Sequence, residues 1–106
     1  MIDKELKEIT DRLVRALSPV KIYLFGSFAR NEERPGSDYD IYIVMPDRIK
    51  IKPLLWEIAY GSVQDVRTRP IDFVMGTVSG FENRKSLPTI EKVVAQEGLV
   101  FVSRIS

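Results

Sequence analysis

Three aspartates lie in hydrophobic segments of the sequence, where carboxylates are unusual. Asp38 and Asp40 stand one residue apart at the start of the run DYDIYIV, and Asp72 lies in the run PIDFVM. Alternate side chains of a strand point to opposite faces, so Asp38 and Asp40 are expected to share a face. If the two runs are neighbouring strands, all three carboxylates emerge together, and like charges so close raise each other's pKa. A divalent cation removes that conflict, and carboxylate oxygens that share a substrate phosphate suit Mg²⁺.

A small pair, Gly26 and Ser27, follows the apolar run VKIYLF, where a strand gives way to a short helix expected over 27–30. Backbone N–H groups at such a junction can hold an anion, glycine permits close approach, and the Ser27 hydroxyl can add a hydrogen bond. The pair therefore predicts a phosphate site beside the metal site.

Each of these features also has a plain structural interpretation. A glycine-serine pair after a strand is more often a simple turn. A single Asp-x-Asp before a strand is more often an exposed edge feature, and Asp72 alone can be a hydrogen-bonded residue at a strand start. The three aspartates taken together with their surrounding strands favour the metal site.

The segments that must position these residues follow helix and strand patterns in turn. Apolar residues at steps of three and four predict an amphipathic helix over 2–17, which Ser18 and Pro19 end. Further helices are expected over 51–66, 79–84 and 88–96, and strands over 20–25, 38–44, 70–75 and 99–102, with Gly76 as a stop. This order predicts a single α+β domain over residues 1–106, with one sheet whose aspartate-bearing face is uncovered.

The composition limits the chemistry that the chain can perform. Of its 106 residues 44% are hydrophobic, and it has no cysteine and no histidine, which excludes disulfides, Cys-based zinc sites and histidine bases. Sixteen Lys and Arg against fifteen Asp and Glu give a net charge of +1, so no duplex DNA partner is expected. No apolar stretch approaches the roughly 20 residues that span a bilayer. We expect a cytoplasmic protein with no membrane partner.

The spacing of these residues resembles that of a known family. Gly26 and Ser27 are followed by ten residues and then by Asp38-Tyr39-Asp40, with Ser37 before the first aspartate and Asp72 on a later strand. In this the chain resembles the minimal nucleotidyltransferases, or MNT proteins, of the DNA polymerase β superfamily. The resemblance covers essentially the whole chain. It implies a polymerase β-like fold, a mixed sheet with helices on one face and the active site on the other.

The resemblance also implies a role for each residue of the motif. Asp38 and Asp40 would bind Mg²⁺ ions, two per site, that bridge the nucleotide phosphates, and Asp72 would complete the site of the catalytic metal. Gly26 and Ser27 would hold the outer phosphates. Arg30 would steady the triphosphate, although an arginine in such a loop is usually a solubility residue.

The implied reaction is the transfer of AMP from ATP to a hydroxyl, with release of pyrophosphate. The chain is similar to the MNT antitoxins of HEPN/MNT toxin-antitoxin systems, which silence a HEPN ribonuclease toxin by AMP transfer to a tyrosine. ATP and a HEPN-type toxin are therefore the expected partners, and a homo-oligomer is possible. The alternatives are a non-catalytic antitoxin that masks its partner, and the catalytic subunit of a two-chain enzyme acting on a small molecule or RNA.

Two further features bear on partners. Trp56, Tyr60 and Val63 form a second stripe on their helix, which is either a broad buried arc or an aromatic anchor for a partner or second copy. Arg67 and Arg69 come just before the strand that bears the third aspartate. They can attract phosphate or an acidic partner, or simply form a solvated loop.

Overall fold

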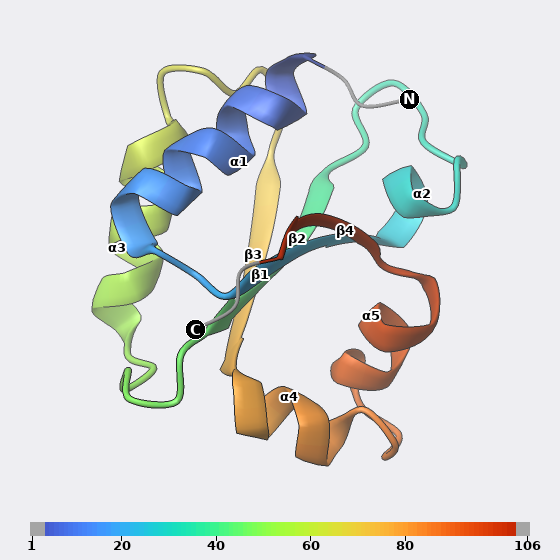
Figure 1. The fold of residues 1–106 in the computed structure, drawn as a ribbon. Coiled ribbons are helices and arrows are strands. Elements are labelled where there is room, and N and C mark those ends of the chain that lie inside the picture. The colour runs from blue at the N-terminus through green and yellow to red at the C-terminus, as the bar shows by residue number, and fades with distance from the viewer. Residues whose placement is uncertain (1–3, 104–106) are drawn as a thin grey trace.

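The computed structural model describes residues 4–103, which form a four-stranded sheet with five helices (Figure 1). The elements are α1 (Lys4–Leu17), β1 (Lys21–Phe25), α2 (Gly26–Ala29), β2 (Tyr39–Met45), α3 (Pro53–Val63), β3 (Ile71–Thr77), α4 (Val78–Arg84), α5 (Ile90–Glu97) and β4 (Leu99–Ser103). The predicted α+β class is confirmed, and Ile2 of the predicted first helix lies outside the described residues. None of the helices in this range is long and apolar enough to cross a bilayer.

The strand order β3-β2-β1-β4 makes β2 and β3 direct neighbours. These two strands run parallel, with α3 in the crossover between them, whereas β1 pairs antiparallel with both β2 and β4. The register pairs Asp40 with Asp72, so the two side chains leave the sheet on the same face. The two aspartate-bearing strands are therefore neighbours, which is the condition on which the predicted carboxylate cluster depends.

One face of the sheet packs against α1 and α3 (Figure 1). The helices bury the apolar stripes predicted from their periodicity, and the strands contribute the residues that alternate with the aspartates. The core on this side includes Leu6, Ile9 and Leu13 from α1, Leu55, Ala59 and Val63 from α3, and Ile22, Leu24, Ile41, Ile43, Ile71 and Phe73 from the sheet.

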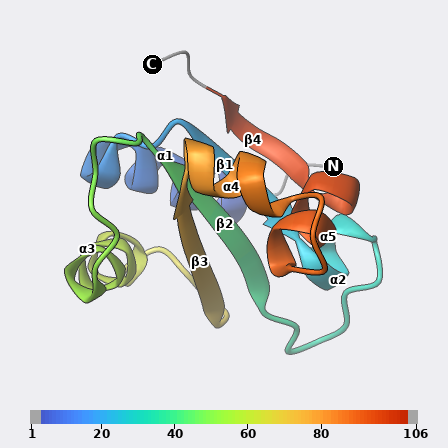
Figure 2. The ribbon, with the colours of Figure 1, turned by 90° about the horizontal axis from the view of Figure 1, so that it is seen from below.

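The opposite face is also covered, but only in part, and here the expectation of helices on a single face is wrong. In Figure 2, α4 and α5 lie over this face and leave the first residues of β2 and β3 uncovered. Tyr42 and Val44 continue the face of Asp40 with apolar surface, which is buried against Phe81 of α4 and Val94 of α5. The polar part of this face is thus confined to the end that carries the aspartates.

A buried polar network joins this second layer to the sheet. Tyr42 is fully buried and donates its hydroxyl to Oε2 of Glu91 at 2.8 Å, and Nε of Arg84 donates to Oε1 of the same carboxylate at 3.1 Å. Burial would raise the pKa of Glu91, but the hydrogen bonds from Tyr42 and Arg84 outweigh it and hold that pKa below its usual value. Gly76 does not end β3 as predicted, since the strand continues to Thr77. A Cβ at this position would overlap the Tyr42 hydroxyl, so glycine provides the space that the hydroxyl occupies.

The start of α4 also differs from the prediction. Thr77, rather than Ser79, is the N-cap, and its side chain accepts a hydrogen bond from the N–H of Gly80 at 3.2 Å. Ser79 instead donates through its N–H and its hydroxyl to Oδ1 of Asp47, both at 2.9 Å. These bonds fix the loop after β2 to the helix that follows β3 and hold the pKa of Asp47 below its usual range.

The buried network predicts the cost of removing one hydroxyl. Tyr42→Phe should lower the free energy of unfolding by about 1–3 kcal/mol at neutral pH, because it leaves a buried carboxylate short of a donor. Glu91 is held ionised by its partners, so its contribution is present at neutral pH and is lost as the pH falls through its lowered folded-state pKa. The difference between wild type and Tyr42→Phe should therefore shrink in acid, as chemical denaturation at several pH values would measure. Tyr60→Phe makes the same change on an exposed ring and should alter stability by less than about 0.5 kcal/mol; equal losses in both variants would contradict the network.

Candidate active site

The three aspartates lie at the uncovered end of the second face. Asp38 comes one residue before β2 rather than within it, Asp40 is the second residue of β2, and Asp72 is the second residue of β3. Asp38 and Asp40 are half-buried and Asp72 is exposed. Among the described residues, none of the three forms an ion pair with a basic side chain. The structure therefore brings the carboxylates to one end of the sheet without neutralising them.

The ionised carboxylate of Asp40 lies in electrostatically unfavourable surroundings. Burial raises the pKa of its carboxyl, the negative charges of Asp72 and Asp38 raise it further, and only the charge of Arg30 opposes them. A carboxylate in these surroundings gains free energy from any cation that approaches it. A raised pKa caused by burial and by like charges is also a common mark of a functional site.

The donor set fits Mg²⁺, but as an open site. Within residues 4–103, no group of three or more acidic side chains converges closely enough to enclose a metal ion by itself. Mg²⁺ keeps octahedral geometry and is usually held by one or two carboxylates, with water and substrate phosphates as its other ligands. The aspartates can thus provide part of a coordination shell that a phosphate-bearing substrate completes.

Gly26 connects this cluster to the end of β1. It has a φ of 75°, and a Cβ at this position would overlap the carboxylate of Asp40. Only glycine meets both conditions, because L side chains rarely adopt such a φ and no space is left for one. The N-cap of α2, Phe25, makes no side-chain hydrogen bond to the first turn. The structure thus brings Gly26 against Asp40, and Ser27 follows it in α2.

Arg30 ends α2 and is already engaged by acidic partners. Its Nε donates to Oε1 of Glu32 at 2.7 Å, and its Nη1 donates to Oε1 of Glu97, in α5, at 2.9 Å. Its charge still reaches Asp40, whose pKa it lowers. A phosphate that bound Arg30 would therefore compete with Glu32 and Glu97 for the guanidinium.

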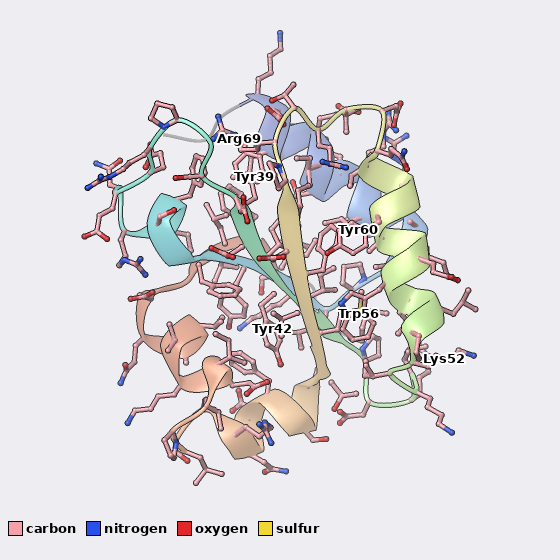
Figure 3. The ribbon with its side chains drawn as sticks, turned by 180° about the vertical axis from the view of Figure 1, so that it is seen from behind. Tyr39, Tyr42, Lys52, Trp56, Tyr60 and Arg69 are labelled. Atoms are coloured by element: carbon pink, nitrogen blue, oxygen red, sulfur yellow. The ribbon has the colours of Figure 1, made fainter. Side chains whose placement is uncertain are left out.

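Arg69 makes contacts within the chain that the sequence does not predict. Its guanidinium lies against the rings of Phe28 and Tyr39, and its Nη1 donates to the carbonyl of Ser37 at 3.1 Å. Figure 3 shows Arg69 beside Tyr39. The side chain of Arg69 is half-buried, whereas the residues immediately before and after it in the loop before β3 are exposed. No local pattern reveals this role, because the contacts join Arg69 to residues more than 25 positions away in the sequence.

The aromatic stripe on α3 belongs largely to the core. Val63 is fully buried, and Trp56 is half-buried with its indole N–H donating to the carbonyl of Phe73 at 2.9 Å. Tyr60 packs edge-on against the Phe73 ring with 4.8 Å between centroids. Figure 3 shows Trp56 and Tyr60 on the side of α3 that faces β3. Because β3 is an edge strand, these contacts cover its outer edge. The broad buried arc is confirmed for Trp56 and Val63.

The sequence matches a known family over nearly its whole length. The profile of the family described as nucleotidyltransferase domain matches residues 4–100. The chain therefore belongs to the nucleotidyltransferase domain family, as its motif indicates. Among curated proteins, none matches the chain.

Several solved structures share the fold. A protein from Sulfolobus solfataricus assigned as a nucleotidyltransferase superposes with a TM-score of 0.62 at 20% identity, covering 95% of this chain and 79% of that one. A toxin-antitoxin structure with AMP-PNP gives a TM-score of 0.65 at 23% identity, over 92% and 73% of the two chains. A mutant of the toxin-antitoxin MntA-HpeT gives 0.61 at 21% identity, over 92% and 72%. At these identities the likeness shows a common fold.

The contact between Gly26 and Asp40 predicts a specific cost of adding one methyl group. Gly26→Ala must adopt an unfavourable φ, at about 1–2 kcal/mol, and must also displace the Asp40 carboxylate, at about 1–3 kcal/mol more. Gly36→Ala is the matched control, because Gly36 has a φ of 87° but no atom within 4 Å of the added Cβ. Denaturant titration should show the larger loss for Gly26→Ala, and Asp40→Ala in the same chain should recover part of it. Equal losses at the two glycines would contradict the described contact.

The raised pKa of Asp40 predicts that removing its charge stabilises the metal-free protein. A carboxyl whose folded-state pKa lies above its unfolded value destabilises the fold at higher pH, and this cost disappears as the pH falls below the folded-state pKa. Asp40→Asn should therefore raise Tm at neutral pH, with a smaller gain in acid, and should abolish any rise in Tm caused by Mg²⁺. Asp65→Asn should lower Tm at neutral pH, because Arg12 holds the pKa of Asp65 below its usual range and the charged carboxylate stabilises the fold. A fall in Tm for Asp40→Asn at neutral pH would show that the carboxylate is stabilised rather than strained.

Proposed function

We propose that this protein is an Mg²⁺-dependent nucleotidyltransferase that transfers AMP from ATP to a hydroxyl group. The observation that carries the proposal is the register of β2 and β3, which pairs Asp40 with Asp72 at the uncovered end of the sheet. Membership of the nucleotidyltransferase domain family supports a transferase activity.

We assign the site residues as follows. Asp38, Asp40 and Asp72 hold Mg²⁺, which when bound neutralises the phosphates and the crowded carboxylates alike. Gly26 and Ser27 hold the outer phosphates, where the close approach of backbone and the uncapped first turn of α2 support anion binding. Arg30 steadies the triphosphate by exchanging Glu97 for a phosphate oxygen.

The reaction needs one bond formed and one broken at the α-phosphorus. The acceptor oxygen bonds to the α-phosphorus, the bond from that phosphorus to the oxygen bridging the β-phosphate breaks, and pyrophosphate leaves. Asp72 accepts the proton of the attacking hydroxyl, since the chain has no histidine. Its position on the outermost strand, with an exposed side chain, supports access by a large acceptor.

A protein acceptor is the best supported. Two of the similar solved structures are toxin-antitoxin structures, one with AMP-PNP and one in which two aspartates, one residue apart, are changed to glutamates. That spacing is the spacing of Asp38 and Asp40. We therefore propose that the chain is a cytoplasmic antitoxin and that its acceptor is a tyrosine of a HEPN ribonuclease toxin.

Transfer of labelled AMP tests this function directly. With ATP labelled at the α-phosphate, Mg²⁺ and a HEPN-type protein encoded by an adjacent gene as the candidate acceptor, that protein should gain label and the mass of one AMP and lose its ribonuclease activity. Asp72→Asn should slow the transfer by roughly 10³-fold, because a group that acts on the attacking oxygen contributes several kcal/mol. Asp65→Asn, on the far side of the sheet, should transfer at the wild-type rate.

The same assay separates modification from masking. If the toxin gains no label, and the double variant Asp38→Ala, Asp40→Ala still silences it, the protein acts by covering its partner and the proposed transfer is wrong.

A further inference from the structure

We propose that Arg69 is a positioning residue, which fixes the three backbone segments of the site relative to one another through its contacts with Phe28, Ser37 and Tyr39. The inference rests on the proposed nucleotidyltransferase function, because it assigns to Arg69 the placement of that function's metal and phosphate ligands.

The first contact is a three-membered cluster of side chains. The guanidinium carbon of Arg69 lies 4.9 Å from the ring centroid of Phe28 and 5.4 Å from that of Tyr39. The two rings also contact each other, with centroids 4.7 Å apart and planes at 46°. Cation–π contacts of this kind are directional and favour one relative placement of the three side chains.

The second contact holds the backbone on both sides of Asp38. Nη1 of Arg69 donates to the carbonyl of Ser37 at 3.1 Å, and the N–H of Tyr39 donates to the carbonyl of Pro70 at 3.0 Å. Asp38 lies between these two anchored residues. The segment that leads into β3 therefore holds the backbone on both sides of Asp38, which comes just before β2.

Each of the three segments of the site contributes at least one residue to this arrangement. Phe28 follows Ser27 in α2, Ser37 and Tyr39 flank Asp38, and Arg69 comes three residues before Asp72. The loop from Asn31 to Gly36 is exposed throughout and has no side chain in the core to hold the first two segments together. Arg69 supplies a connection between the phosphate half and the metal half of the site.

The guanidinium acts by its shape rather than as a counter-charge. Among residues 4–103, Arg69 forms no ion pair with an acidic side chain. Nε of Arg69 is buried and has no hydrogen-bond partner within the described residues, so the ring contacts and the bond from Nη1 to Ser37 hold the head group. A lysine retains the charge but offers neither a plane to stack on the rings nor a fixed direction for its donors.

The test compares Arg69→Lys with Arg48→Lys, the same change at an exposed arginine in the loop after β2. Two quantities are measured well below Tm: the dissociation constant for Mn²⁺ in the presence of a non-hydrolysable ATP analogue, by electron paramagnetic resonance, and KM for ATP with kcat for transfer. Arg69→Lys should weaken Mn²⁺ binding and raise KM by about tenfold each, the combined worth of a cation–π contact and a hydrogen bond. Arg48→Lys should match wild type.

Each outcome decides between the two proposals. Unchanged Mn²⁺ binding and KM in Arg69→Lys, with or without a lower Tm, would overturn the positioning role while leaving the transferase function intact. Weaker Mn²⁺ binding in Arg69→Lys, alongside a wild type that transfers no AMP, would support the positioning role and reject the transfer. If Arg69→Lys does not fold, Phe28→Leu removes one ring face while remaining apolar and should show the same two effects; wild-type values there would overturn the inference.

Discussion

The parallel pairing of β2 with β3 is the constraint on which the site depends. It fixes Asp40 opposite Asp72 on one face, and burial together with this neighbour raises the pKa of Asp40. The surroundings of the cluster maintain the strain instead of relieving it. Gly26 leaves room for the carboxylate, no basic side chain of the described residues pairs with it, and α4 and α5 stop short of it. A site arranged in this way favours a cation that arrives with its substrate.

Two acidic side chains on this side of the sheet, Glu91 of α5 and Asp40 of β2, have opposite electrostatic surroundings. Glu91 is buried with donors from Tyr42 and Arg84, which hold its pKa low and make it part of the packing between α5 and the sheet. Asp40 is half-buried, the structure records no side chain or backbone N–H within residues 4–103 that donates to its carboxylate, and its pKa is raised. A satisfied buried carboxylate contributes to specificity of the fold, whereas an unsatisfied one is typical of a functional centre. One end of this face, around Glu91, thus contributes to the stability of the fold, and the other end, around Asp40, carries the candidate site.

The candidate site residues can be singled out from sequence, whereas their surroundings cannot. The two-residue period of a strand and the spacing of Gly26, Ser27, Asp38 and Asp40 are local, so they could be read directly. The cover provided by α4 and α5 was missed because Tyr42 shares a face with the aspartates, and its burial depends on the distant Glu91. From sequence, Gly76 predicts a strand end, because the contact that requires glycine there, with the Tyr42 hydroxyl, comes from a neighbouring strand. Arg69 could not be placed because its ring and backbone partners are joined to it only by the tertiary fold.

We infer that a divalent cation relieves the unfavourable burial and charge repulsion of the Asp40 carboxylate. Carbon-13 NMR titration of the aspartate carboxyls, with Asp40 assigned from the spectrum of Asp40→Asn, measures this directly. Without metal, Asp40 should titrate above the ordinary aspartate range, and Mg²⁺ with a non-hydrolysable ATP analogue should move its pKa downward. An Asp40 that titrates in the ordinary range, or that does not respond to Mg²⁺ and nucleotide, would contradict the account.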